Sequence, residues 1–371
     1  MDLSLSPEDR ALADEARTWL ATNVELPPAF ASLEEEVGWG VRWQAKLASA
    51  RWVGIHWPEE YGGRGASPVQ VALFNAEYAR SRAPQVVNRV GINLAGPTLL
   101  AHGTEEQRAR YLPRILDASE IWCQLFSEPG AGSDLASLTT RAEPTDGGWL
   151  ISGQKVWTSY AQFAKWGICL ARTNPDAPKH KGISYFIVDV AQPGVSVRPL
   201  VQITGNAEFN EVFLDDVFVP TENLVGTEDN GWRVAATTLA HERGTNFPFK
   251  EQVVHEILLA RVLEQHGDAL DDEIYADELA QCYVACRLLA LSNLRTLTRL
   301  AKGEQPGPES SVVKLQWTAL TQQLSDLWLR IAPLDATAQH QFLWSKAASI
   351  AGGTSEVQKD IIGERLLTLP R

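Results

Sequence analysis

The chain has 371 residues, of which 44% are hydrophobic and 21% are charged, a composition typical of a globular protein with two or three domains. Its formal net charge of -13 argues against a general nucleic-acid binder, whose affinity depends on neutralising phosphates. No uninterrupted apolar run is long enough to span a bilayer, and the acidic N-terminus is unlike a signal peptide. We therefore expect no membrane association and a cytoplasmic location.

The N-terminal region is predicted to be helical up to about residue 118. Ser6-Pro7-Glu8-Asp9 has the pattern of a helix start, with a capping residue, proline at the first position and then acids. The stretches 68–82 and 104–117 have helical apolar spacing with polar faces, and a loop over 56–63 interrupts the region.

The middle region changes character and is predicted to be a small antiparallel sheet or barrel. Its segments are short, rich in β-branched and aromatic residues, and separated by Gly, Pro, Asn and Asp. They are 149–159, 166–172, 182–190, 195–201 and 210–220. No helical pattern intervenes between them.

From Asp229 onward the pattern returns to long helices. The predicted helices are 230–243, 251–266, 272–302, 308–331, 338–350 and 355–368. The fold class is therefore α+β with three regions: an N-terminal helical domain over 1–118, a central antiparallel β-domain over 119–228 and a C-terminal helical bundle over 229–371.

The four cysteines, Cys123, Cys169, Cys282 and Cys286, do not form paired metal-ligand clusters. Cysteine is commonly a small core residue, and Cys282 and Cys286 stand four apart on a predicted helix. We interpret all four as reduced thiols and expect no metal site.

Near the C-terminus, the stretch SIAGGTSEVQ places Gly352 and Gly353 before a predicted helix. Ser355 and Gln358 have the spacing of a capping box, in which each side chain satisfies a backbone donor of the first turn. A glycine pair before a helix allows backbone to approach a ligand and directs N–H groups at negative charge. The turn is therefore a candidate cradle for an anionic ligand.

Two further motifs are candidates for binding. FSEPGAGSDL over 126–135 combines a Pro-Gly turn with a second glycine, and then Ser133 and Asp134. Such a loop can present N–H groups and a hydroxyl to a bound group, although most glycine-rich loops are only turns. GQKVWTS over 153–159 ends a strand with Trp157 and two hydroxyls, which can wall a planar ring and bond its edge. Alone, the stretch would favour a core tryptophan with surface hydroxyls.

Together with NEVFLDDVFVP and GGTSEVQ, these motifs occur in the order found in the acyl-CoA dehydrogenase family, which the chain resembles over most of its length. The likeness is weakest between about 250 and 345. It implies FAD as cofactor, an acyl-CoA thioester oxidised at Cα–Cβ, and electron-transfer flavoprotein as electron acceptor. The hydride would go to flavin N5.

The resemblance also implies site residues. Ser133 would lie by the pyrophosphate and the thioester, Trp157 would cover the flavin ring, and Ser159 would face N5. The implied FAD-binding residues are Leu125, Phe126, Ser127, Gly132, Ser133, Trp157, Thr158, Ser159, Gly353, Thr354 and Glu356.

The catalytic base is displaced from its usual position. Many family members carry the catalytic Glu immediately before the Gly-Thr of the C-terminal turn, where this chain has Gly352. The spacing of Glu356 places it in the first turn of the last helix, where the helix dipole favours an acid. We interpret it as a cofactor contact or as a residue that stabilises this helix. A branch acting on branched or bulky acyl-CoAs resembles this chain in carrying a Glu-Arg pair on the helix over 230–243. We therefore predict Glu242 as base and Arg243 as a neighbour that orients it or binds substrate. The alternative is an ordinary solvated or ion-paired glutamate, and desolvation would favour the base by raising its pKa.

Two family features are missing. Neither an Arg-x-x-Phe-Gly motif after this helix nor the Gln and Gly-Gly segment that clasps the adenosine end is found. Relatives acting on sterol-derived thioesters show similar losses and assemble as α2β2 tetramers. A homo-oligomer and an α2β2 hetero-oligomer therefore both stay open. So do two alternative functions, a catalytically quiet structural subunit and a flavin monooxygenase or oxidase on the same fold.

Overall fold

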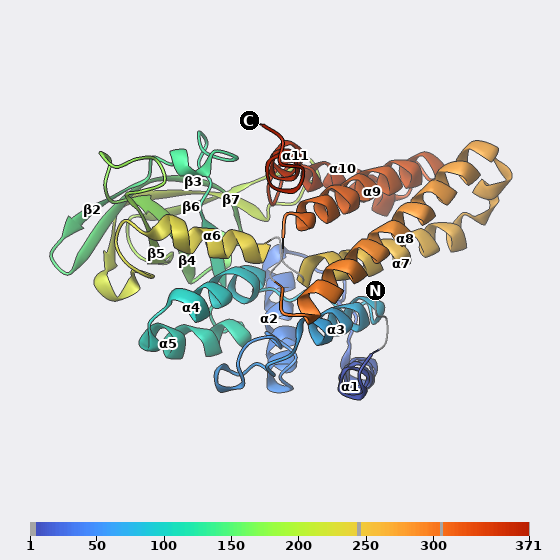
Figure 1. The fold of residues 1–371 in the computed structure, drawn as a ribbon, viewed down its shortest axis with the longest axis horizontal. Coiled ribbons are helices and arrows are strands. Elements are labelled where there is room, and N and C mark those ends of the chain that lie inside the picture. Colours follow the sequence, from blue (N-terminus) through green and yellow to red (C-terminus); the bar gives the residue numbers. More distant parts are fainter. Residues whose placement is uncertain (1–4, 243–245, 305–306, 371) are drawn as a thin grey trace. The chain divides into compact units, whose positions relative to one another are not determined.

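The computed structural model describes residues 5–242, 246–304 and 307–370 (Figure 1). The side chains of residues 242–249 lie outside this description. The chain divides into two compact units. The sheet unit consists of Pro27–Gly65 and Gln85–Glu242, and the helical unit consists of Met1–Leu26, Ala66–Pro84 and Arg243–Arg371. The boundaries of the three predicted domains stay a prediction.

The sheet unit is built around a seven-stranded sheet, with β5 pairing β4 beside the path β1-β4-β2-β3-β7-β6. The strands are β1 (Trp122–Leu125), β2 (Arg141–Thr145), β3 (Gly148–Ser159), β4 (Trp166–Arg172), β5 (Ile183–Asp189), β6 (Val195–Leu200) and β7 (Phe209–Pro220). The five predicted strands are confirmed to within one residue at each end, as β3, β4, β5, β6 and β7. The long β3–β7 pairing is antiparallel, as predicted.

Two short strands, β1 and β2, were not predicted, and both pair with β4 in parallel. β4 and β5 are buried along almost their whole length, because their apolar residues run continuously and do not alternate with polar ones. Buried side chains of these strands, among them Cys169, Phe186 and Val188, form the core of the unit with Val212 of β7.

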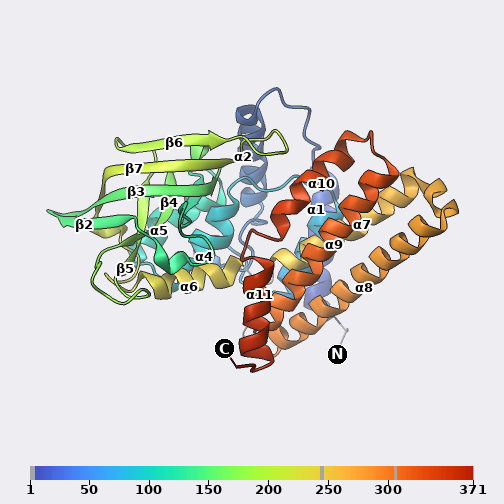
Figure 2. The same cartoon turned by 90° about the horizontal axis from the view of Figure 1, so that it is seen from above.

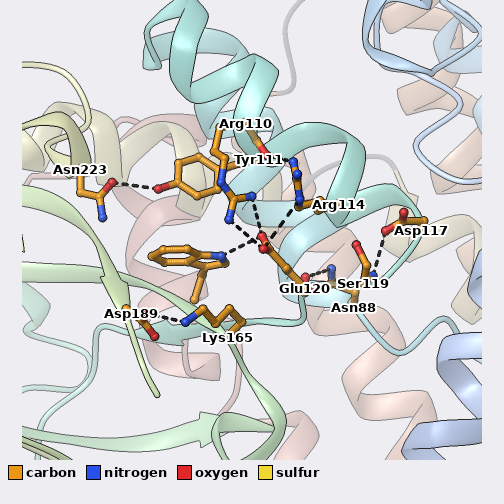
Figure 3. A network of polar contacts seen from close by, with 11 residues as sticks. Asn88, Arg110, Tyr111, Arg114, Asp117, Ser119, Glu120, Lys165, Asp189 and Asn223 are labelled. Atoms are coloured by element: carbon orange, nitrogen blue, oxygen red, sulfur yellow. Dashed lines mark hydrogen bonds and ion pairs between the residues drawn. The ribbon is translucent and has the colours of Figure 1, made fainter. Parts of the chain in front are cut away.

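The helices of the sheet unit are α2 (Leu33–Ser49), α4 (Gly96–His102), α5 (Glu105–Leu116) and α6 (Gly231–Glu242). Figure 3 shows how α5 is tied to the sheet through the carboxylate of Glu120. Both terminal nitrogens of Arg110 donate hydrogen bonds to this carboxylate, at 2.9 and 2.8 Å. The indole N–H of Trp166, at the start of β4, donates to it at 2.8 Å. Bidentate pairing of this kind fixes orientation as well as distance.

The helical unit contains α1 (Pro7–Asn23), α3 (Pro68–Arg80), α7 (Asn246–Gln265), α8 (Glu273–Ala301), α9 (Glu309–Ile331), α10 (Ala336–Ala348) and α11 (Ser355–Ile361). Figure 2 shows α7, α8 and α9 running side by side. Apolar residues such as Leu289, Leu324 and Trp328 form the core of this unit. α1 begins with the predicted cap, since Ser6 and Asp9 form a reciprocal capping box. The predicted three-region fold class is confirmed.

The four cysteines are buried free thiols, as predicted. No helix within the described ranges is long and apolar enough to cross a membrane. The cytoplasmic location stays a prediction.

Candidate functional site

The FSEPGAGSDL and GQKVWTS motifs lie side by side in the sheet unit. The first follows β1 and the second ends β3, and the amide of Val156 donates to the carbonyl of Ser127 at 2.9 Å. Two segments that are well separated in the sequence therefore form one local structure.

Trp157 is exposed because β3 is irregular where it pairs with β7. The register shifts between Lys155 and Thr158, and Trp157 adopts a φ of 60°, in the left-handed region. Its side chain is 63% exposed, although its ring meets Phe209 edge-on with centroids 6.3 Å apart. A non-glycine residue with this backbone conformation marks a local constraint, and here the constraint turns a large flat ring toward solvent.

Leu125 and Phe126 have the opposite environment. They are 0% and 3% exposed, and the Phe126 ring packs edge-on against Tyr185 with centroids 5.8 Å apart. Their side chains therefore belong to the core, so that only their backbone is free to face a ligand. Ser127 is half-buried, and the turn beyond it is open.

The turn that carries Gly132 and Ser133 has room for a ligand. Both residues are exposed, and a Cβ added at Gly132 would meet nothing within 4 Å. Asp134 forms an ion pair with Lys179, and the hydrogen bond from this lysine lowers the pKa of the Asp134 carboxyl. The hydroxyl of Ser133 is therefore available in an open loop, as the motif predicts.

Thr158 and Ser159 follow the exposed indole. Thr158 is fully buried, and its hydroxyl has no hydrogen-bond partner among the described residues. Its carbonyl accepts a bond of 3.0 Å from the side-chain amide of Asn210. The exposed Trp157 ring, the half-buried Ser159 and the open turn at Gly132, where an added Cβ would meet nothing within 4 Å, leave room for a flat ligand. The residues present are thus compatible with FAD.

The C-terminal turn belongs to the helical unit. Gly352 and Gly353 have φ values of 66° and 91°, which a side chain would strain, so both glycines are needed for this backbone path. Glu356 is exposed in the first turn of α11. The turn has the conformation of a cradle, and its role as a ligand site stays a prediction.

The predicted capping box in this turn is wrong. The N-cap is Thr354, whose hydroxyl accepts a bond of 3.2 Å from the amide of Val357, whereas Ser355 is already inside the helix. Gln358 is buried, and its amide donates to the carbonyls of Gly352 and Gly353, at 3.3 Å each. In a capping box the side-chain oxygen of Gln358 would accept from the cap backbone, but this Oε1 is buried without a hydrogen-bond partner among the described residues.

α6, which carries the predicted base, is anchored inside the sheet unit. The hydroxyl of Thr238 is within 2.8 Å of that of Thr98 and 3.2 Å of that of Tyr185, and all three are buried. One turn beyond Thr98 on α4, the Nε2 of His102 lies 2.7 Å from the hydroxyl of Thr237 on α6.

Glu242 is the last residue of α6. The environment of its carboxylate, and Arg243 as a whole, lie outside the described residues. The roles predicted for both residues therefore stay predictions.

The motifs contain two further residues that sequence reasoning did not single out, Glu128 and Lys155. They form a buried ion pair of 2.9 Å that joins the two segments. The signal was present in the sequence, because Lys155 occupies an inward-facing position of a predicted strand, where lysine is rarely found without a partner. Within the described ranges, no group of three or more His, Cys, Asp or Glu could hold a metal ion, so nothing there contradicts the expectation of no metal site.

Comparison with known proteins gives three family models that match in order: acyl-CoA dehydrogenase N-terminal domain over 6–119, middle domain over 123–217 and C-terminal domain over 229–367. The acyl-CoA dehydrogenase IpdE1 of Mycobacterium tuberculosis is 42% identical over 377 residues, covering 96% of this chain and 97% of the relative.

Among solved structures, a "Tcur3481-Tcur3483 steroid ACAD" is similar with a TM-score of 0.87 and 29% identity, and the two chains cover each other completely. The ChsE4-ChsE5 complex from Mycobacterium tuberculosis is similar with a TM-score of 0.84 and 30% identity, again over the whole of both chains. The names of both structures describe complexes of two different proteins.

Proposed function

Because the chain belongs to the acyl-CoA dehydrogenase family, we propose that it dehydrogenates a bulky, branched or cyclic acyl-CoA with Glu242 as the base. The chain is an oxidoreductase of the acyl-CoA dehydrogenase type, and its cofactor is FAD. The observation that carries the proposal is the hydrogen bonding of α6 to Thr98 and Tyr185. These contacts anchor the helix that ends in Glu242 inside the unit that also contains the FSEPGAGSDL and GQKVWTS motifs. A bulky acyl group is supported by the likeness to a protein named as a steroid ACAD.

In this proposal the two adjacent segments of the sheet unit hold FAD. Trp157 would cover one face of the ring system and Ser159 would provide a hydroxyl at its edge, while the fully buried Thr158 would support this strand end from within. The backbone of Leu125, Phe126 and Ser127 lines the same site, and Gly132 and Ser133 face the pyrophosphate. Gly353, Thr354 and Glu356 are proposed as further FAD-binding residues, as the family resemblance implies.

The chemistry divides between cofactor and chain. FAD, when bound, supplies the hydride acceptor for the β-hydrogen. Glu242 removes the α-proton of the thioester, and Arg243 orients Glu242 or binds the substrate. Hydrogen bonds to the thioester carbonyl stabilise the developing enolate, with Ser133 close to the thioester. A positioned general base typically contributes about 10²–10⁴-fold to the rate.

The test is the visible spectrum of the purified full chain, before and after anaerobic addition of a panel of acyl-CoAs. Stoichiometric flavin bands that bleach with bulky or cyclic thioesters are the expected result. Bleaching only with short straight-chain thioesters would overturn the substrate class. Flavin bands that no acyl-CoA bleaches would favour the structural subunit, and rapid reoxidation by air would favour an oxidase or monooxygenase.

We also propose that the chain works as an oligomer with a second dehydrogenase-like subunit, identical or different. Val284, Leu288 and Leu291 follow the i, i+4, i+7 spacing on α8, and they are 54%, 52% and 47% exposed. Such a stripe of exposed apolar side chains marks an interaction surface. The heteromeric ChsE4-ChsE5 complex supports a two-protein assembly, and electron-transfer flavoprotein is the proposed acceptor. Full FAD occupancy and activity of the chain expressed alone would exclude an obligate different subunit.

A further inference from the structure

Lys155 is a completely buried lysine whose charge is fully paired. Its side chain is 0% exposed, and its ammonium donates to the carbonyl of Phe126 at 3.1 Å and that of Leu170 at 2.8 Å. The third bond, of 2.9 Å, goes to the carboxylate of Glu128. An ammonium group has three donors, so all of them are used, as a charge removed from water requires.

Glu128 is paired equally completely. One carboxylate oxygen accepts from the amide and the hydroxyl of Thr139, both at 2.7 Å. The other accepts from the amide of Thr140 at 2.9 Å, in addition to Lys155. Burial alone would raise the pKa of Glu128, but the charge of Lys155 and these hydrogen bonds lower it to about 2. The group therefore stays ionised at every physiological pH.

The pair holds three consecutive residues of the first motif against the second. Lys155 binds the carbonyl of Phe126, the neighbouring amide of Val156 binds the carbonyl of Ser127, and Lys155 binds the side chain of Glu128. The backbone of Glu128 also exchanges two hydrogen bonds of 3.0 Å with Ala131, which closes the turn that leads to Gly132 and Ser133.

On the other side, Lys155 lies two residues before Trp157, at the register shift that turns the indole outward. The same side chain thus contacts Phe126 and Glu128, where the open turn begins, and stands at the start of the bulge that contains Trp157. A buried ion pair is an inefficient way to gain stability, because desolvation offsets most of the attraction and an uncharged pair of similar volume is often as stable. Its effect here is geometric.

We propose that Lys155 and Glu128 are positioning residues, which set the spacing between the Ser127–Ser133 turn and the Trp157 bulge and so determine how tightly and in what environment the flavin is held. Neither residue touches the flavin; they act through the backbone of Phe126, Ser127 and Val156. The inference rests on the proposed function, in which these two segments form the FAD site.

The experiment uses the full chain with the double substitution Lys155→Met/Glu128→Gln, which removes both charges and leaves no unpaired ion. Lys155→Met alone would leave a buried carboxylate without its partner, and it risks misfolding. The control is Lys165→Met/Asp189→Asn, which removes an ion pair of 2.6 Å between the residue before β4 and the last residue of β5, whose side chains are 40% and 28% exposed.

Two readouts separate this inference from the proposed function. The first is amide hydrogen exchange of the FAD-free chains, where we expect the double variant to exchange at least tenfold faster at Val156 and Ala131 while the control does not. The second is FAD binding, where we expect a dissociation constant at least tenfold higher than in the parent chain and a changed visible circular dichroism of the bound flavin.

Unchanged exchange, or an unchanged dissociation constant and flavin spectrum in the folded double variant, would overturn the positioning role. If the parent chain itself bound no FAD at these segments, the proposed function of the isolated chain would fail. The exchange rates would still decide whether the pair fixes the two segments.

Discussion

The amide of Val156 donates to the carbonyl of Ser127 across 2.9 Å, and this bond joins the two motifs on which the functional prediction depends. On one side of it lies the open Pro-Gly turn, and on the other lies the exposed indole of Trp157. Because the bond is between backbone groups, the side chains next to it are free to serve binding. The candidate site is thus built around a backbone contact, and the adjacent ion pair of Lys155 and Glu128 also joins the two motifs.

Replacing the predicted base should separate chemistry from cofactor binding. In Glu242→Gln we expect FAD to stay bound and acyl-CoA-dependent flavin reduction to slow by about 10²–10⁴-fold, because the amide cannot accept the α-proton. Stopped-flow absorbance under anaerobic conditions measures the reduction. Glu356→Gln is the control, since its side chain is exposed in the first turn of α11. A large loss in that variant, with Glu242→Gln unaffected, would move the base to Glu356.

Trp157 should matter for FAD and hardly at all for folding. Its side chain is 63% exposed, so Trp157→Ala should change the free energy of unfolding by less than about 0.5 kcal/mol. Loss of the ring that covers the flavin should raise the FAD dissociation constant by about tenfold, as expected for one lost stacking contact. Phe218→Ala, which removes a 42% exposed ring from the same sheet, is the control. Equal FAD affinity in all three proteins would remove Trp157 from the site.

His56 should make the protein lose stability in mild acid. Burial, and then the charge of nearby His241, lower the pKa of His56 to about 4, below its usual value of 6.5. The unfolded chain therefore binds this proton more readily, so stability should fall as the pH drops from 6.5 toward 4, by up to about 3 kcal/mol.

Urea midpoints measured across this pH range for the parent chain and His56→Gln test this prediction. The variant should lack this part of the pH dependence, while the two proteins should have parallel curves between pH 7.5 and 8.5. Parallel curves below pH 6.5 as well would show that His56 titrates normally in the folded protein.

Gly153 should not tolerate a side chain. A Cβ at this position of β3 would lie 2.3 Å from the hydroxyl oxygen and 2.8 Å from the Cα of Thr140. Gly153→Ala should therefore cost about 1–3 kcal/mol in the free energy of unfolding, because a backbone atom has to move. Gly267→Ala, where nothing lies within 4 Å, should be neutral or slightly stabilising. Denaturant unfolding of both variants is the measurement, and equal stabilities would contradict the prediction.

The cap of α11 should depend on Thr354 and not on Ser355. Thr354→Ala removes the hydroxyl that accepts from the amide of Val357 and should cost about 1 kcal/mol of local stability. Ser355→Ala should leave the helix intact, because that residue is already helical. Hydrogen exchange of the amides of Val357 and Gln358 reports on this helix directly. Faster exchange in the serine variant alone would restore the capping box expected from the sequence.

Much of the fold could be predicted because it depends on local patterns. The apolar runs of β4 and β5 and the long amphipathic helices α8 and α9 were found within a few residues of their observed ends. β1 and β2 were missed because each has only four or five residues, too few to show a period, and both owe their strand conformation to pairing with β4. The capping box was predicted wrongly for a similar reason, since the spacing of Ser355 and Gln358 does not reveal that Thr354 is the N-cap and that the Gln358 amide donates to the two glycine carbonyls.

The sequence alone determined which residues are available for chemistry, namely the glycine turn and the Trp-Thr-Ser strand end, and it led to the prediction that Glu242 is the base. Their order along the chain, matched to a known family, also determined the cofactor. Only the tertiary structure decided that Ser127 and Val156 meet, that Leu125 and Phe126 turn their side chains into the core, and that Lys155 is paired with Glu128. Residue types follow from local chemistry, whereas a contact between distant residues depends on how the strands pair and on which charges can be buried only together.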